Sequence, residues 1–186
     1  MKERASTSVQ TRVKPLSTRT PTDTHIAIRT RKHWSAGRPV TEAELENYFS
    51  RMTAVPEIGT RGLHNLRSAN VTVVGVGGVG SSISYYLAQS GIGHLRLIDQ
   101  DIVEPSNLHR LQGLDQSDLY HPKAEALADS LHRLVPSSRF EAIVDTLREA
   151  NVSELLGGSD VIVDGLDNFR TRFILNRHSE IGRAHV

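Results

Sequence analysis

The chain has 186 residues, a length that favours one domain with a tail. Its composition, 38% hydrophobic and 23% charged, is ordinary for a globular protein, and the absence of cysteine excludes disulfides, thiolate zinc sites and thiol nucleophiles from these residues. No apolar run approaches a membrane span, and the polar, basic N-terminus is unlike a secretory signal. We therefore expect a cytoplasmic protein that does not contact a membrane.

A net charge of +1 hides an uneven distribution. Residues 1–40 hold nine Lys and Arg against two Asp and Glu, which leaves 13 basic and 19 acidic residues, a net charge of −6, in residues 41–186. The first segment is rich in Ser and Thr, and only "HIAIR" (25–29) resembles a strand. It is predicted to be a disordered basic tail, or upstream sequence included by an early start codon. The alternative is an arm that binds nucleic acid or a partner subunit. Because Trp34 is its only Trp, Phe or Tyr, we expect no nucleic-acid partner.

Two short helices are expected next. "TEAELENYFSRM" begins with Thr41 and has Glu44 three residues later, the pattern of a capping box, so a helix is predicted over about 42–52. "VPEIG" interrupts it, and "RGLHNLRSA" (61–69) predicts a second helix.

From residue 71 onward, apolar segments of strand length alternate with segments of helical periodicity. The strands are expected at 71–75, 94–99, 140–145 and 160–165, and the helices at 81–91, 121–135, 149–158 and 168–179. Gly91 and Gly157 are expected to end helices, and Pro122 to begin one. This alternation predicts a doubly wound, Rossmann-like α/β domain over 41–179, with a parallel sheet, right-handed crossovers and helices on both faces.

The turn after the first strand has a phosphate-binding pattern. In "VTVVGVGGVGSS" (71–82), Gly75, Gly77 and Gly80 fit G-x-G-x-x-G: a tight turn, a close backbone approach to a phosphate, and close packing of helix on strand. The N-terminus of the following helix attracts anions. Asp99, at the end of the second strand, is placed to accept hydrogen bonds from ribose hydroxyls. The pattern predicts an adenosine-binding site, and by itself it favours NAD.

Three further features favour a triphosphate. Asn107 and Arg110 follow the second strand in "QDIVEPSNLHR", and Lys123 begins a helix, where a cation is unfavourable unless an anion lies nearby. Asp164 and Asp167 follow the fourth strand, and carboxylates beside a polyphosphate imply Mg²⁺ between them. The alternatives are a solvated loop arginine, an ordinary surface lysine, and an Asp167 that caps its helix.

Together these motifs resemble a known family. "GVGGVGS", "LIDQDIVEPSNLHR", "PKAEAL" and "DGLDNFRTR", in this order and spacing, are similar to the ThiF/MoeB/HesA family of adenylating enzymes, which are related to ubiquitin-activating enzymes. The segment "ENYFSRM…VPEIGTRGLHNLRSANVTVVG" resembles the lead-in of that family, so the resemblance covers 44 to about 179. It implies that ATP activates the C-terminal carboxylate of a ubiquitin-like or sulfur-carrier protein ending in Gly-Gly, and that pyrophosphate is released.

The resemblance also implies roles for individual residues. Asp99 would bind the ATP ribose with help from Asn107, Arg110 and Lys123 would contact the phosphates, and Asp167 would hold Mg²⁺. Arg51 would reach the ATP site of the partner subunit, which implies a homodimer. The remaining nucleotide contacts are expected from Gly75, Gly77, Gly78, Gly80, Ser81 and Asp101. The family usually has Gln directly after the arginine, whereas here Leu111 follows it and Gln112 comes one residue later.

The resemblance implies further sequence beyond this chain: more of the sheet, often two CxxC zinc pairs, and often an acyl-accepting cysteine. The sheet is therefore expected to be truncated on its C-terminal side, with zinc only in the missing part. The final "EIGRAHV" can be encoded by GAG ATC GGA AGA GCA CAC GTC, and a common sequencing adapter reads AGATCGGAAGAGCACACGTC followed by the stop TGA. Our hypothesis is that Ile181 to Val186 are translated adapter and that 180–186 is not native.

Three other functions stay open at this point. A nicotinamide-dependent dehydrogenase is disfavoured by Arg110, Lys123 and Asp167 together. A non-catalytic adaptor would be expected to lack phosphate-contacting residues, which are present here. A family member that adenylates an RNA-base or peptide carboxylate has the same motifs as the main interpretation.

Overall fold

The computed structural model describes residues 41–183 and the side chains of 41–179. The predicted tail with its "HIAIR" strand, and residues 184–186, lie outside the described residues. The described chain begins with the helices α1 (Glu42–Tyr48), α2 (Ser50–Thr53) and α3 (Gly59–Ser68). The capping box is confirmed, because Thr41 and Glu44 cap each other. The single helix predicted over 42–52 is wrong: it breaks at Phe49, whose buried ring packs against Gly91.

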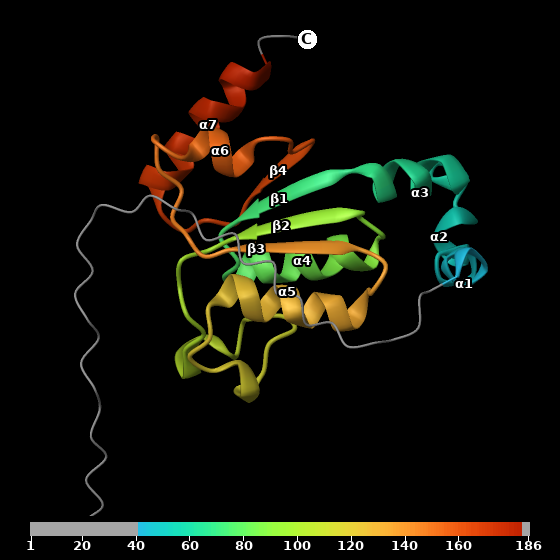
Figure 1. The fold of residues 1–186 in the computed structure, drawn as a ribbon, viewed down its shortest axis with the longest axis horizontal. Coiled ribbons are helices and arrows are strands. Elements are labelled where there is room, and N and C mark those ends of the chain that lie inside the picture. Colours follow the sequence, from blue (N-terminus) through green and yellow to red (C-terminus); the bar gives the residue numbers. More distant parts are fainter. Residues whose placement is uncertain (1–40, 184–186) are drawn as a thin grey trace, which may run out of the picture.

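Four parallel strands form the sheet, as predicted. They are β1 (Asn70–Val74), β2 (His94–Ile98), β3 (Arg139–Ile143) and β4 (Val161–Asp164), in the order β3-β2-β1-β4. The chain moves outward from β1 to β3 and then crosses back to place β4 on the other side of β1 (Figure 1). This reversal makes the carboxyl ends of β1 and β4 the topological switch point, where doubly wound sheets bind ligands.

Helices cover both faces of the sheet, as predicted (Figure 1). On one face lie α4 (Gly78–Gln89) and α5 (Lys123–Leu134), and on the other lie α6 (Val152–Leu156) and α7 (Phe169–Arg183). Between β2 and α5 the chain forms two short 3₁₀ turns, η1 (Pro105–Asn107) and η2 (Gln116–Asp118). Gly91 has a positive φ just after α4, whereas after α6 the left-handed position belongs to Gly158 and not to Gly157.

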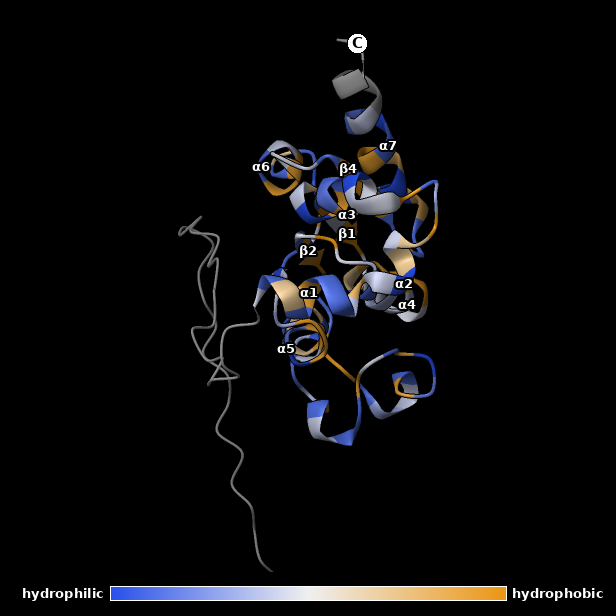
Figure 2. Ribbon diagram, turned by 90° about the vertical axis from the view of Figure 1, so that its right-hand side faces the viewer, coloured by the Kyte–Doolittle hydropathy of each residue, from blue (hydrophilic) through white to orange (hydrophobic). Residues whose placement is uncertain are grey.

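Alternating side chains of the strands enter two cores, and the apolar strands lie at the centre of the molecule (Figure 2). Val73 and Leu95 point toward α4 and α5, where they meet Leu127 and Leu131, and all four are fully buried. The neighbouring strand positions point toward α6 and α7. The core on that side consists of Val74, Ile98, Ile143, Leu147, Val152, Leu155, Leu156 and Leu175. Both faces of the sheet are thus buried, as parallel sheets require.

A third, smaller core holds the long connection between β2 and α5 in place. Val103, Leu111 and Ala126 are buried there, with Leu108 and Leu119 packed around them. Backbone pairing adds to this anchoring, because Val103 donates to the His121 carbonyl and accepts from the Tyr120 amide. The connection is therefore an ordered lobe beside the carboxyl ends of the strands.

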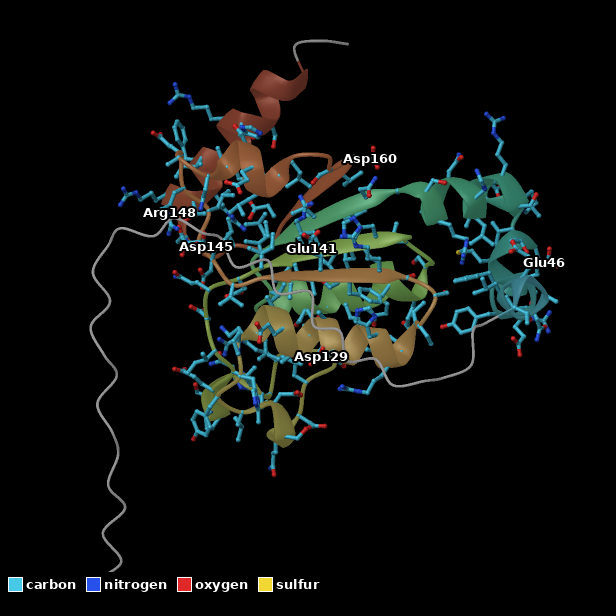
Figure 3. The ribbon with its side chains drawn as sticks, in the orientation of Figure 1. Glu46, Asp129, Glu141, Asp145, Arg148 and Asp160 are labelled. Atoms are coloured by element: carbon cyan, nitrogen blue, oxygen red, sulfur yellow. The ribbon has the colours of Figure 1, made fainter. Side chains whose placement is uncertain are left out.

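The amino ends of the strands are held by polar contacts of a different kind. Arg96 donates to Glu141 on β3 at 3.0 Å and to the Leu155 and Gly157 carbonyls at the end of α6. Figure 3 shows Glu141 over the sheet, with Asp160 beside the start of β1, where it accepts from the Asn70 amide. These contacts fix α6 to the sheet and lie away from the switch point.

No helix within residues 41–183 is long and apolar enough to cross a membrane.

Tyr120 generates a prediction about stability. It adopts φ +67° although it is not glycine, and its side chain is 70% exposed. The left-handed conformation costs a residue with a Cβ about 1–2 kcal/mol. We expect Tyr120→Gly to raise the free energy of unfolding by about 1 kcal/mol relative to Tyr120→Ala, which keeps the Cβ. Urea denaturation of both variants measures the difference, and an Ala variant as stable as the Gly variant would contradict it.

Candidate functional site

A cavity of about 600 Å³ lies at the switch point, between the β1–α4 loop, the lobe after β2 and the β4–α7 turn (residues 164–167). Nine residues singled out from the sequence line it: Gly77, Gly78, Asp99, Asp101, Asn107, Arg110, Lys123, Asp164 and Asp167. They come from segments up to 90 residues apart, and the ends of parallel strands bring them together.

The glycine loop is shaped by two backbone contacts and one open position. Gly75 has φ +85°, and a Cβ on Gly80 would lie only 1.8 Å from the Gly75 carbonyl oxygen. Neither Gly75 nor Gly80 lines the cavity, so their effect on it is through the shape of the loop. Gly77 does line it, and a Cβ there would meet no protein atom within 4 Å. The protein leaves this space free for a ligand next to the N-terminus of α4.

Asp99 joins the glycine loop to the next one. One carboxylate oxygen accepts from the Val76 amide and the other from the Asp101 amide, each at 2.8 Å. Burial raises the pKa of Asp99 above its usual value, although the two amides and the Lys123 charge oppose the shift. A desolvated carboxylate with free lone pairs beside a glycine loop is a good acceptor for hydroxyl groups of a ligand.

Lys123 is not an ordinary surface lysine, which corrects that alternative. The residue is 6% exposed, and its ammonium group lies 2.9 Å from Asp101 Oδ2. The Lys123 amide donates to the Asp101 carbonyl, so the first residue of α5 is tied to the loop after β2 twice. The anion expected near this cation is supplied within the chain by Asp101. The pair lies in the cavity wall, where an anionic ligand would meet the ammonium group.

Arg110 packs its aliphatic stem on Gly78. A Cβ on Gly78 would lie 3.3 Å from Arg110 Cδ, so a larger residue there would have to displace the side chain. The guanidinium donates to the Ser106 carbonyl at 3.3 Å and lines the cavity. Asn107 is 7% exposed and donates to Ser106 Oγ. The lobe therefore presents an amide and a cation side by side.

Ser81 has a different place from the one expected. Its side chain is fully buried, and its hydroxyl accepts from the Gln112 amide at 3.1 Å. Ser81 thus fixes the lobe to α4 and does not line the cavity. Leu111, which stands where the family usually has Gln, is buried in the small core of the lobe. Both residues thus anchor the segment that directly follows Arg110.

The β4–α7 turn carries two carboxylates with different surroundings. Asp164 accepts from the Leu166 amide at 3.0 Å and from Arg172 Nε at 3.1 Å. Asp167 is exposed to the cavity and has no hydrogen-bond or ion-pair partner among the described residues. Asp167 does not cap α7, which corrects that alternative, because Asn168 accepts from the Thr171 amide instead.

The charges around the cavity favour a ligand that arrives with a cation. Its wall carries five carboxylates and three cations, an excess of two negative charges. No group of three or more His, Asp and Glu in the part of the chain that the structure describes is placed to hold a metal. A single free carboxylate, Asp167, fits Mg²⁺, which proteins usually bind through one or two carboxylates together with phosphates of the substrate.

Arg51 lies far from this cavity. It belongs to α2, which packs near the C-terminal end of α4 through Phe49 and Gly91, whereas the cavity lies at the N-terminal end of α4 (Figure 1). The twelve residues of α4 separate these ends by roughly 18 Å. Arg51 is exposed and forms no ion pair with other described residues. It does not serve the cavity of its own chain.

Several lining residues were not singled out as site residues from the sequence. They are Val79, Ile102, Glu104, Gly165, Leu166 and Arg172. Arg172 is the most informative, because it is the one cation that α7 contributes. Arg172 is the last residue of the motif "DGLDNFRTR", but the direction of its side chain depends on where α7 begins, which the motif does not determine.

Solved structures with this fold contain ATP. The chain superposes on E. coli tRNA N6-threonylcarbamoyladenosine dehydratase, TcdA, in complex with ATP, with a TM-score of 0.72 and 27% identity over 78% of this chain and 59% of that one. It also superposes on E. coli MccB with ATP, with a TM-score of 0.66 and 25% identity over 73% of this chain and 42% of that one.

Sequence relatives lead to a family. The chain is 41% identical over 128 residues to the SAMP-activating enzyme E1 of Haloferax volcanii, covering 69% of this chain and 47% of the relative. It is 38% identical over 136 residues to the sulfur carrier protein adenylyltransferase of Thermus thermophilus, covering 73% and 50%. The chain thus spans about half the length of these relatives. The ThiF family model matches residues 49–181, and the chain belongs to the ThiF family.

Proposed function

We propose that this chain is the nucleotide-binding part of a cytoplasmic enzyme that adenylates the C-terminal carboxylate of a ubiquitin-like or sulfur-carrier protein ending in Gly-Gly. Residues 41–179 would form this unit, and the enzyme would act as a homodimer. The observation that carries the proposal is the cavity at the switch point, which unites Asp99, Arg110, Lys123 and Asp167 around the open position at Gly77.

Different residues of the cavity wall fit different parts of ATP. Asp99 would accept hydrogen bonds from the ribose, with Asn107 beside it. The free space at Gly77 and the N-terminus of α4 would receive phosphates, which Arg110 and Lys123 would neutralise. Asp101 would stay near the phosphates as the partner of Lys123. Asp167 would hold Mg²⁺, which supplies positive charge to the phosphates when it is bound.

The proposed reaction needs little covalent participation by the protein. A carboxylate oxygen of the carrier attacks the α-phosphorus of ATP, the bond from that phosphorus to the bridging oxygen breaks, and pyrophosphate leaves with the bonding electrons. The products are an acyl-adenylate and pyrophosphate. A carboxylate is already ionised at pH 7, so no general base is required. The protein's contribution is to hold two anions together and neutralise their charge.

The similar proteins differ in the substrate that their names indicate. SAMP-activating enzyme E1 and sulfur carrier protein adenylyltransferase are names that point to carrier proteins. TcdA is named for a modified tRNA base, and MccB has a structure together with MccA-N7isoASN. We favour a carrier protein because the sequence relatives at 38–41% identity carry those names, whereas TcdA and MccB are 25–27% identical.

Gly77 and Gly80 provide a matched pair of variants for ATP binding. A Cβ on Gly77 enters only open space, so Gly77→Ala is expected to leave stability within about 0.5 kcal/mol and to weaken ATP binding about tenfold. A Cβ on Gly80 meets the Gly75 carbonyl, so Gly80→Ala is expected to destabilise the fold by about 1–3 kcal/mol. Calorimetric titration with ATP and urea denaturation separate the two effects. Unchanged ATP affinity in Gly77→Ala would place the phosphates elsewhere.

Adenylation itself is tested by ATP–pyrophosphate exchange. The complete gene product, mixed with a carrier protein ending in Gly-Gly, is expected to catalyse exchange, whereas residues 1–186 alone are expected to give little. Arg110→Ala or Asp167→Ala should each lower the rate by about a hundredfold, because each removes charge stabilisation from the reacting phosphates. Exchange at the wild-type rate in either variant would contradict the assignment of the site. Tight binding of NAD without binding of ATP would instead favour the nicotinamide-dependent dehydrogenase.

Arg51 is tested by mixing two inactive variants of the complete enzyme. If Arg51 serves the partner's site, a dimer of one Arg51→Ala and one Asp167→Ala subunit has one site with both residues intact. Random exchange of subunits should therefore restore about a quarter of the wild-type rate, since half the dimers are mixed and half their sites are complete. Mixing Asp167→Ala with Arg110→Ala is the matched control and should restore nothing, because both residues act in their own subunit.

A further inference from the structure

We infer that Arg172 is a positioning residue of the nucleotide site: through Asp164 it holds the β4–α7 turn against the glycine loop and leaves Asp167 as the free carboxylate of that turn. This inference rests on the proposed function and assigns a role to a cation that the proposed chemistry does not use.

The turn and the glycine loop touch through their backbones. A Cβ on Gly165 would lie 2.3 Å from the Gly75 carbonyl oxygen and 3.0 Å from Gly80 Cα. In the other direction, a Cβ on Gly75 would lie 2.9 Å from the Gly165 carbonyl carbon and oxygen. With no side chain between them, a displacement of one segment displaces the other. The position of the turn therefore determines the shape of the phosphate loop.

Asp164 is the fixed point of the turn. Its backbone is still in the sheet, paired with Val74 of β1, and its side chain accepts from the Leu166 amide. The second carboxylate oxygen accepts from Arg172 Nε at 3.1 Å. Asp164 thus connects the strand end, the turn and the first turns of α7 through one side chain. Removal of Arg172 leaves the α7 side of this connection open.

Arg172 also sets the charge that the turn presents. Asp164 and Asp167 both line the cavity, three residues apart. Arg172 neutralises Asp164, whereas Asp167 has no partner among the described residues. A metal–nucleotide complex then meets one defined carboxylate in place of two that compete for it. The ion pair is partly exposed, with 47% of the Arg172 side chain and 38% of the Asp164 side chain accessible, so its direct contribution to stability is small. Its effect is expected on binding.

The test is a double-mutant cycle on ligand binding by the wild-type chain and its variants. Arg172→Leu and Asp164→Asn are each expected to weaken Mg-ATP binding about tenfold, and the double variant no more than either single variant, because both remove the same contact. Affinity for adenosine should stay unchanged, since the hydrogen-bond partners of Asp99 are the Val76 and Asp101 amides and not residues of the turn. General damage to the fold would lower adenosine affinity as well. Arg170→Leu, an exposed arginine on α7 outside the cavity, is the matched control.

A second readout follows the turn itself. Hydrogen exchange of the Leu166 amide, which donates to Asp164, should be faster in Arg172→Leu than in the wild type and unchanged in Arg170→Leu. Equal Mg-ATP affinity of Arg172→Leu and wild type would overturn the inference alone. A loss of Mg-ATP affinity in Arg172→Leu without a loss in Asp164→Asn would also overturn it, because Arg172 would then contact the phosphates directly. A wild-type chain that binds adenosine but no ATP would overturn both this inference and the proposed function.

Discussion

The site depends on one steric constraint, the direct backbone contact between the glycine loop and the β4–α7 turn. β1 and β4 are paired in parallel and end at the same level, but their helices leave toward opposite faces of the sheet. The two connections can begin so close together only because Gly75, Gly80 and Gly165 carry no side chain. A cavity that has free backbone amides on one side and carboxylates on the other is the direct consequence.

The charge of the cavity wall is the second determinant of what the site can bind, and it is not the charge expected for a polyanion site. A site for a polyanion would be expected to be basic, yet carboxylates outnumber cations in its wall. Two of the three cations, Lys123 and Arg172, are already paired with Asp101 and Asp164. A triphosphate bound here, as we propose, would need positive charge from outside the chain. The unpaired Asp167 could recruit it as Mg²⁺, and an arginine of a second copy could add to it.

The sequence predicted the position of the site better than its internal contacts. Residues at the carboxyl ends of parallel strands must meet, so Asp99, Arg110 and Asp167 could be placed at one edge from the strand pattern alone. Ser81 could not, because a shift of the helix start decides which side of α4 it faces, and α4 begins at Gly78 instead of residue 81. The helix break at Phe49 could not be predicted either. It accompanies the burial of Phe49 against Gly91, a contact between distant segments that a local helical pattern does not contain.

The length of α4 separates the cavity from the place where the N-terminal helices pack. One end of this helix meets the cavity, and the other end carries the packing site for α1 and α2. A side chain on α2 cannot span the helix to reach the cavity of its own chain, however it is oriented. If Arg51 takes part in the reaction, it therefore acts on another molecule, and two copies must bring α2 of one beside the cavity of the other. Dimerisation would then be a condition of catalysis that follows from the dimensions of a helix, and not from a separate regulatory device.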